Sequence, residues 1–196
     1  MEQPSLTVQK NNPLSWLKLA LTGVNMLILL PPILAEQGVN KVADLLYRVL
    51  GFLCHQRADR SFYLFGEALQ YSKERVWNEL PSSQIFTLDF KERFTCNSEF
   101  GCKFGVCSRC TGMYLGLLLG VIGAEYLMRI KIPRFIPILF LIPLILDGSV
   151  QTFAYILAPE RGFYESTNPR RFATGLLFGL GVGYLTVSAV SPVIAK

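Results

Sequence analysis

Four long apolar segments constrain this chain of 196 residues more than any other feature. They cover residues 15–35, 104–128, 132–157 and 172–195, and a helix of about 20 apolar residues is enough to cross a bilayer core. Mean hydropathy is +0.36 and only 17% of the residues are charged, which is too apolar for an ordinary soluble domain of this size. The sequence therefore predicts an all-α, multi-pass membrane protein that is embedded in a lipid bilayer.

The segments between these spans are shorter or more polar. Residues 1–14 lack the basic region and cleavage site of a signal peptide, so we expect a polar tail. Residues 39–53 place apolar side chains at helical spacing opposite charged ones, which predicts an amphipathic helix along the membrane surface. Residues 67–103 are hydrophilic, and we expect them to form a loop inserted into a single membrane domain of residues 15–196.

Charge indicates an orientation in the membrane. The net charge of +5 is spread along the chain, so nucleic acid is not an expected partner. Arg129, Lys131 and Arg134 cluster in the turn between the second and third spans, and the positive-inside rule then puts this turn and both termini in the cytoplasm. Arg161, Arg170 and Arg171, which the other short loop carries, oppose this orientation. We expect a protein of the cell membrane, and the sequence leaves its oligomeric state open.

The polar motifs of the chain fall at one membrane face. With four spans, the loop after the first span and the loop after the third span lie on the same side. Residues 54–61, 107–111, 147–151 and 166–174 all lie at or near that side. We therefore expect one polar site at this end of the helix bundle.

Two cysteines open the second span with a spacing that brings their thiols to one point. Cys107 and Cys110 have the Cys-x-x-Cys spacing shared by zinc knuckles and redox dithiols. Cys54 and His55 come from the same membrane face, so the sequence predicts a zinc site formed by these four residues. Because neighbouring ligands are awkward on one tetrahedral ion, Cys54 or His55 can instead support the site from outside the coordination.

The cysteine spacing leaves other chemistry open. A redox-active Cys107 and Cys110 pair would make the protein a membrane thiol–disulfide oxidoreductase. The spacing Cys102-x4-Cys107-x2-Cys110 also matches part of a plant-type ferredoxin loop, although no cysteine follows downstream. Inert buried thiols are a further alternative, as is a non-catalytic assembly subunit of a membrane complex. The presence of a single histidine argues against a hydrolytic zinc site of the two-histidine type.

The two remaining cysteines lie apart from this set. Cys96 and Cys102 are six residues apart in the hydrophilic stretch. They are expected to form a local disulfide if that stretch lies outside the cytoplasm, or to be free thiols if it does not.

A carboxylate inside the third span indicates a second polar constellation. Asp147 is costly in an apolar helix without a cation, a metal or a hydrogen-bond donor, and Gln151 follows it by one helical turn. A structural pair with an arginine is the plain interpretation. Arginines from the same face outnumber this carboxylate, so the cluster can also hold an anionic or lipid-like ligand. The expected ligand pocket comprises Arg57, Arg60, Ser61, Arg109, Tyr114, Asp147, Gln151, Asn168, Arg171 and Thr174.

Asn168 and Pro169 have a second, purely local interpretation. Asparagine is a favoured N-cap and proline is favoured at the first helical position, so the pair predicts the start of the last span.

The motifs together resemble a known family, the small membrane proteins grouped as domain of unknown function 2085. The resemblance covers about residues 45–185, and it implies a multi-pass membrane protein without implying an activity. This chain departs from the compact form of that family by inserting the hydrophilic stretch of Cys96 and Cys102. The motifs that carry the resemblance are Cys54-His55-Gln56 with Arg60-Ser61, Cys107-x-Arg109-Cys110-Thr-Gly112-x-Tyr114-x-Gly116, Asp147-Gly148 with Gln151, and Asn168-x-x-Arg171-x-x-Thr174-Gly175.

Overall fold

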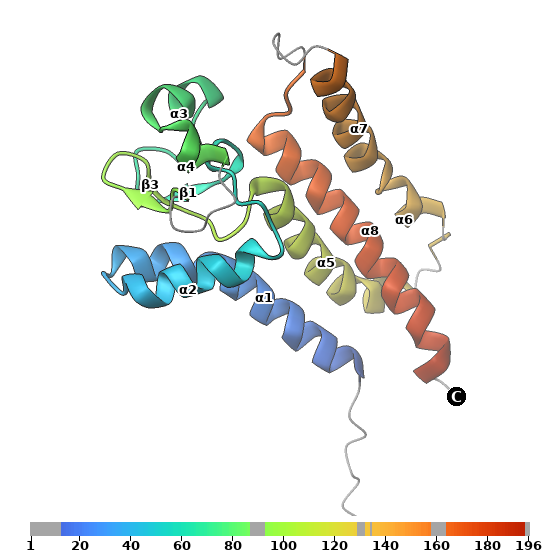
Figure 1. The fold of residues 1–196 in the computed structure, drawn as a ribbon. Coiled ribbons are helices and arrows are strands. Elements are labelled where there is room, and N and C mark those ends of the chain that lie inside the picture. The colour runs from blue at the N-terminus through green and yellow to red at the C-terminus, as the bar shows by residue number, and fades with distance from the viewer. Residues whose placement is uncertain (1–12, 87–92, 129–131, 134, 158–163, 195–196) are drawn as a thin grey trace, which may run out of the picture.

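The computed structural model describes most of the chain, and its elements are shown in Figure 1. The basic turn used above to orient the protein falls largely outside the described residues, as does nearly all of the polar tail. The described residues are 13–86, 93–128, 132–133, 135–157 and 164–194.

Four helical segments are long and apolar enough to cross a membrane, which confirms the predicted number of spans and the all-α class. They are built from α1 (Pro13–Glu36), α5 (Ser108–Leu127), α6 (Phe135–Leu139) with α7 (Ile142–Leu157), and α8 (Asn168–Ile194). The third span is interrupted between α6 and α7, where Pro143 in the first turn of α7 has no N–H to continue the hydrogen bonds of α6.

Helices α5 and α8 pack backbone against backbone through glycines. A Cβ atom on Gly116 would collide with the Leu176 carbonyl of α8, and one on Gly179 would collide with the Met113 carbonyl of α5. The glycines recur every fourth residue, so each helix presents a flat stripe to the other. The stripes consist of Gly112, Gly116 and Gly120 on α5, and of Gly175, Gly179 and Gly183 on α8.

Helix α2 (Asn40–Gly51) is the expected amphipathic helix, and it lies beside the C-terminal end of α1 (Figure 1). Tyr47 and Leu50 are buried against the protein. Leu45 is 59% exposed and Phe52, just after the helix, is 84% exposed. An apolar stripe exposed next to two spans suits a helix that rests on the bilayer surface.

The stretch expected as a polar loop instead belongs to a folded module that covers one end of the bundle (Figure 1). Its three short strands pair antiparallel in the order β1-β3-β2, and a core of aromatic and aliphatic side chains lies beside them. A disulfide joins Cys96 on β2 to Cys102 on β3, which are cross-strand partners. The elements of the module are η1 (Ala58–Arg60), β1 (Tyr63–Leu64), α3 (Lys73–Glu79), α4 (Ser82–Phe86), β2 (Cys96–Asn97) and β3 (Gly101–Lys103).

Candidate functional site

Three free thiols meet where the module joins the bundle. The Sγ atoms of Cys54, Cys107 and Cys110 all lie within 4.8 Å of one another, and those of Cys107 and Cys110 are 3.4 Å apart. Cys54 follows α2, Cys107 is the N-cap residue of α5, and Cys110 lies in the first turn of α5. The fold thus brings together three of the four residues that the sequence assigned to a metal.

Backbone geometry prepares Cys54 to carry negative charge. Its sulfur accepts hydrogen bonds from the backbone N–H of Gln56 at 3.4 Å and of Cys107 at 3.3 Å. Hydrogen bonds from the Cys107 and Cys110 side chains are the largest influences that lower the pKa of Cys54, and the two backbone N–H groups lower it further. These hydrogen bonds favour the thiolate form of Cys54.

Gln56 holds the turn that follows Cys54 in place. Its φ of 51° lies in the left-handed region, which a glutamine adopts only when its surroundings hold it there. Its fully buried amide donates to the carbonyls of Tyr47 at 2.8 Å and Gly105 at 2.6 Å. The buried Lys103 ammonium donates to the Gln56 carbonyl at 3.0 Å, and burial lowers the pKa of Lys103 to about 7.

The thiols form one side of a cavity of about 350 Å³. Arg57 and Arg60 line it together with His55. The imidazole of His55 is exposed and does not belong to the group of atoms within 4.8 Å. Cys102, the remaining member of the ferredoxin-like spacing, is held in the disulfide with Cys96 and is not free to ligate a cluster.

Asp147 has the arginine partner expected of a buried carboxylate. Arg109, from the first turn of α5, donates to one oxygen of Asp147, and the Tyr164 hydroxyl donates to the other at 2.9 Å. Asp147 and Gln151 are only 6% and 4% exposed. With its amide turned to accept, Gln151 receives N–H groups from Arg171 at 2.8 Å and from Arg60.

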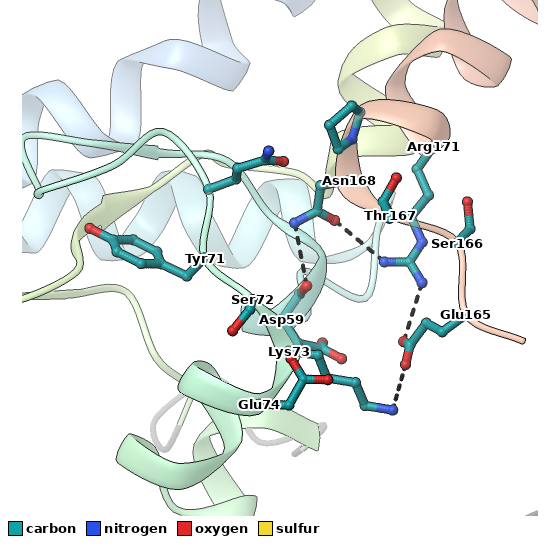
Figure 2. Close-up of a pocket in the computed structure, with 12 residues that line it drawn as sticks. Asp59, Tyr71, Ser72, Lys73, Glu74, Glu165, Ser166, Thr167, Asn168 and Arg171 are labelled. Atoms are coloured by element: carbon teal, nitrogen blue, oxygen red, sulfur yellow. Dashed lines mark hydrogen bonds and ion pairs between the residues drawn. The ribbon is translucent and has the colours of Figure 1, made fainter. Parts of the chain in front are cut away.

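Glu165 gathers three cations and was not found by sequence reasoning. Its carboxylate pairs with Arg60 at 3.5 Å. It also pairs with Arg171 at 3.3 Å and with Lys73 from the module, as Figure 2 shows. Burial favours the neutral acid, but Lys73 and the two arginines outweigh it and lower the pKa of Glu165. Pairing at this site depends on a module that the sequence pattern did not predict.

Asp59 is a third carboxylate of this cluster and further reduces its surplus of positive charge. Asp59, with 1% of its side chain exposed, pairs with Arg57 at 2.6 Å. The cluster therefore contains three carboxylates, where sequence analysis counted one. It remains net positive, because five cations face these three anions. The cations are Arg57, Arg60, Lys73, Arg109 and Arg171, and the carboxylates are those of Asp59, Asp147 and Glu165.

Asn168 holds the module to the bundle, and its predicted capping role is wrong by one residue. The first helical bond of α8 runs from Arg171 N–H to the Thr167 carbonyl, so Thr167 occupies the cap position. The Asn168 amide donates to the carbonyls of Asp59 and Ser61, both at 3.4 Å (Figure 2 shows the bond to Asp59). Its oxygen accepts from Ser108 on α5 at 3.2 Å, if the hydroxyl donates.

The other residues assigned to the ligand pocket play local roles in the structure. Ser61 is buried and donates to the carbonyl of Arg57 at 2.8 Å. Thr174 donates to the carbonyl of Arg171 within its own helix at 3.1 Å. Tyr114 packs against the apolar cluster beside the thiols. None of the three lines the two cavities beside the arginines of this cluster, of about 350 and 510 Å³.

Comparison with known proteins finds one family model and uncharacterized archaeal proteins that resemble the chain. The family model described as "Predicted membrane protein (DUF2085)" matches residues 96–185. An uncharacterized protein of Methanocaldococcus jannaschii is 30% identical over 141 residues, covering 70% of this chain and 63% of that protein. An uncharacterized protein of Methanothermobacter thermautotrophicus is 38% identical over 89 residues, covering 44% of this chain and 72% of that protein. No solved structure matches the chain.

The extent of these matches bears on the site. The match to the Methanocaldococcus protein spans less than two thirds of that relative's length. The family model includes Cys107, Cys110 and Asp147 but begins after Cys54. The third thiol therefore has to be assigned from the geometry of this chain.

Proposed function

The chain belongs to the family described as "Predicted membrane protein (DUF2085)", and from its own site we propose that it is a metal-binding membrane protein. Cys54, Cys107 and Cys110 bind a divalent metal ion, zinc by the nature of its ligands. The metal lies beside an arginine-lined cavity that accepts an anionic group.

The clustering of the three thiols carries this proposal. Thiolates that bind one tetrahedral zinc at about 2.3 Å lie about 3.8 Å from each other. The 3.4 Å between Cys107 and Cys110, with all three sulfurs within 4.8 Å, is close to that spacing. Thiolates are soft ligands that favour zinc over magnesium or calcium. The N–H groups that point at Cys54 would also stabilise a metal-bound thiolate.

A metal ion held by the three thiols would have room for a fourth ligand from the cavity that they line. Three protein ligands with an open position are typical of zinc sites that act on a substrate, whereas closed sets of four are typical of structural zinc. His55 lines this cavity and can complete the set by turning inward. Alternatively, the anionic ligand takes the position.

Arginines make the cavity suitable for an anion. Arg57 and Arg60 line it, whereas the carboxylates that pair with them, those of Asp59 and Glu165, are not among its lining residues. Three thiolates with one zinc ion carry one net negative charge, which is smaller than the surplus of two positive charges in the surrounding cluster. An oxyanion such as a phosphate would complete the balance and match the planar donors of arginine.

Metal analysis of the purified full chain tests the proposal. We expect about one zinc per chain in the wild type and almost none in Cys110→Ser, because two thiolates alone hold zinc weakly. Cys96→Ser with Cys102→Ser is the matched control, since it removes two sulfurs outside the triad and should retain the metal. His55→Ala separates the two models of the fourth ligand, because only a coordinating imidazole would lower zinc affinity when removed. Metal-free wild-type protein would refute the proposal.

The short contact between Cys107 and Cys110 also favours a second candidate, a thiol–disulfide oxidoreductase. Two thiols at 3.4 Å that share a cavity are placed to exchange with a substrate disulfide. That function requires a metal-free chain in which this pair forms a reversible disulfide. Thiol titration with and without reductant distinguishes it, because a bound metal would keep all three thiols reduced.

We further propose that the module and the thiols face the outside of the cell, with both termini in the cytoplasm. The Cys96–Cys102 disulfide supports this orientation, because disulfides persist in oxidising compartments. A membrane-impermeant label at a cysteine introduced by Ser98→Cys, on a Cys-free background of the module, should react in intact cells. Reaction only after lysis would reverse the orientation.

A further inference from the structure

The cavity of about 510 Å³ lies between α7 and the beginning of α5. One face of α7 forms a wall of it, with Ile145, Ser149 and Thr152 one helical turn apart. Arg60 from η1 and Arg109 from the first turn of α5 also line it. Because α5 begins beneath the module, this cavity lies at the membrane face that carries the module (Figure 1).

The wall on α7 is accessible from the bilayer. Helix α7 belongs to the third candidate span, and Ile145 and Phe153 on this wall are 54% and 63% exposed. Ser149 and Thr152 are exposed beside them. Exposed side chains of a spanning helix contact lipid, so a lipid molecule can reach the cavity from the side of the bundle.

Arg109 retains donors that its ion pair with Asp147 does not use. Its Nη2 donates to Asp147. Its Nη1 has no hydrogen-bond partner among the described residues and lies against Gly148 of the wall, where a Cβ atom would be 3.8 Å from it. A guanidinium carries five N–H donors in one plane, so Nη1 can bind an oxyanion while Asp147 keeps Nη2.

The charge of this cavity favours an anion. Arg60 and Arg109 line it, and no carboxylate of the described residues is part of its lining. The carboxylates that pair with these arginines are already counted in the surrounding cluster, which keeps its surplus of two positive charges. A zinc ion with three thiolates balances one of these charges. The single negative charge of a lipid phosphodiester balances the other.

We propose that this cavity binds the anionic phosphate headgroup of a membrane lipid that enters from the bilayer beside α7. The phosphate binds Arg60 and Arg109, and the hydrocarbon chains lie along the apolar side chains of α7. Arg60 also lines the thiol cavity, so the headgroup is held next to the proposed metal. This names the anionic ligand of the proposed function as a lipid, and so rests on that function.

A larger, apolar cavity provides an internal reference for a test. It has a volume of about 660 Å³ between α1, α5 and the start of α8, and no charged residue of the described chain lines it. In a bilayer, hydrocarbon chains can fill such a space whatever headgroup they carry. Labelling of α1 by a lipid chain should therefore be independent of headgroup charge, whereas labelling of α7 should depend on it.

Photocrosslinking tests the headgroup site. The full chain is reconstituted in phosphatidylcholine vesicles that contain phosphatidylglycerol with a photoreactive group in its chain, or phosphatidylcholine with the same group. Labelled segments are identified by mass spectrometry. We expect the anionic probe to label α7 about tenfold more than the neutral probe, the scale of one hydrogen bond to a charged group, and both to label α1 equally. Equal labelling of α7 by the two probes would overturn the proposal.

Two variants locate the preference. Gly148→Leu fills the cavity without meeting backbone, since only Nη1 of Arg109 lies near its Cβ, and it should remove the preference of α7 for the anionic probe. Gly123→Leu is the matched control, because its Cβ meets only the Leu127 side chain and it lies outside the cavity. An unchanged preference in Gly148→Leu would contradict the site.

Arg60→Gln removes one of the two cations that line the cavity. Glu165 keeps its pairs with Arg171 and Lys73 in this variant, so we expect the fold to persist and the preference for the anionic probe to fall. Arg48→Gln on the exposed side of α2 is the control and should preserve the preference. Equal preference in the two variants would contradict a role of Arg60.

Two further measurements on the same samples separate the alternatives. Inorganic phosphate at millimolar concentration should leave the labelling of α7 intact, because the hydrocarbon chains also hold the lipid; loss of labelling would assign the cavity to free phosphate and overturn the lipid. Zinc content separates this proposal from the metal centre. Bound zinc without a preference at α7 contradicts the lipid site only, and a preference at α7 in a chain without zinc contradicts the metal centre only.

Discussion

Helix α5 packs against its two neighbours in opposite ways. Against α8 it is flush, with glycines of each helix against backbone atoms of the other. Against α1 it leaves the apolar cavity, and the polar contacts between them are few. Asn25 donates to the Tyr114 carbonyl at 3.1 Å, and Lys18 pairs with Glu125 at 2.6 Å. One interface excludes any ligand, whereas the other has space for one.

The two interfaces of α5 therefore have different roles in the bundle. Gly175 abuts the Arg109 carbonyl and Gly112 abuts the Phe172 carbonyl, so the close interface continues to the ends that carry Arg109 and Arg171. Rigid placement of two charged side chains is what a polar site requires. The interface with α1 is looser along the apolar cavity, where Met26 and Leu29 of α1 face Leu115 and Leu118 of α5 across empty space.

The largest expected effect comes from breaking the close interface. Gly116→Leu would drive a side chain into the backbone of α8 at Leu176, which cannot move without separating the helices. We expect a loss of about 4 kcal/mol or more in the free energy of unfolding. Gly123→Leu on the same helix is the matched control, because its Cβ would meet only the Leu127 side chain at 3.9 Å. Denaturation by titrated SDS, followed by circular dichroism, measures both, and equal stability of the two variants would contradict the close-packed interface.

A smaller effect is expected from the charge pair that this interface positions. Arg109→Met leaves the Asp147 carboxylate buried without its cation, which should cost about 3 kcal/mol. Adding Asp147→Leu removes the stranded charge and should restore most of the stability. The wild type, Arg109→Met, Asp147→Leu and the double variant form a double-mutant cycle, and their stabilities are measured by the same SDS titration. If the second substitution restored nothing, Asp147 would not depend on Arg109.

Sequence reasoning succeeded where the membrane imposes the rule. A bilayer demands long apolar helices, so the four spans follow from composition and length. Counting them placed Asp147 near arginines of other helices, and Arg109 is its partner. That α5 is the helix packed against the glycines of α8 could be found only from the structure, because a glycine stripe does not specify which helix it faces.

Sequence reasoning failed where contacts between residues far apart in the chain determine the structure. The strands of the module have two or three residues each, too short for an alternating pattern to show. Without the module, Lys73 could not be assigned to Glu165. Cys54 and His55 were both assigned to the metal from their shared membrane face, which does not fix side-chain directions. The Cys54 sulfur lies with the other two thiols, whereas the exposed His55 imidazole lies outside that group and remains a predicted ligand.

The smallest expected effect tests the open interface. Asn25→Leu removes the hydrogen bond from α1 to the Tyr114 carbonyl, and bonds of this kind between membrane helices contribute about 0.6 kcal/mol. Thr22→Val is the control, because Thr22 bonds only to the Lys18 carbonyl within α1 in the described structure. The SDS titration should therefore show Asn25→Leu within about 1 kcal/mol of both the wild type and the control. A cost as large as that of Gly116→Leu would mean that α1 is held against α5 as firmly as α8 is, and it would contradict the difference between the two interfaces.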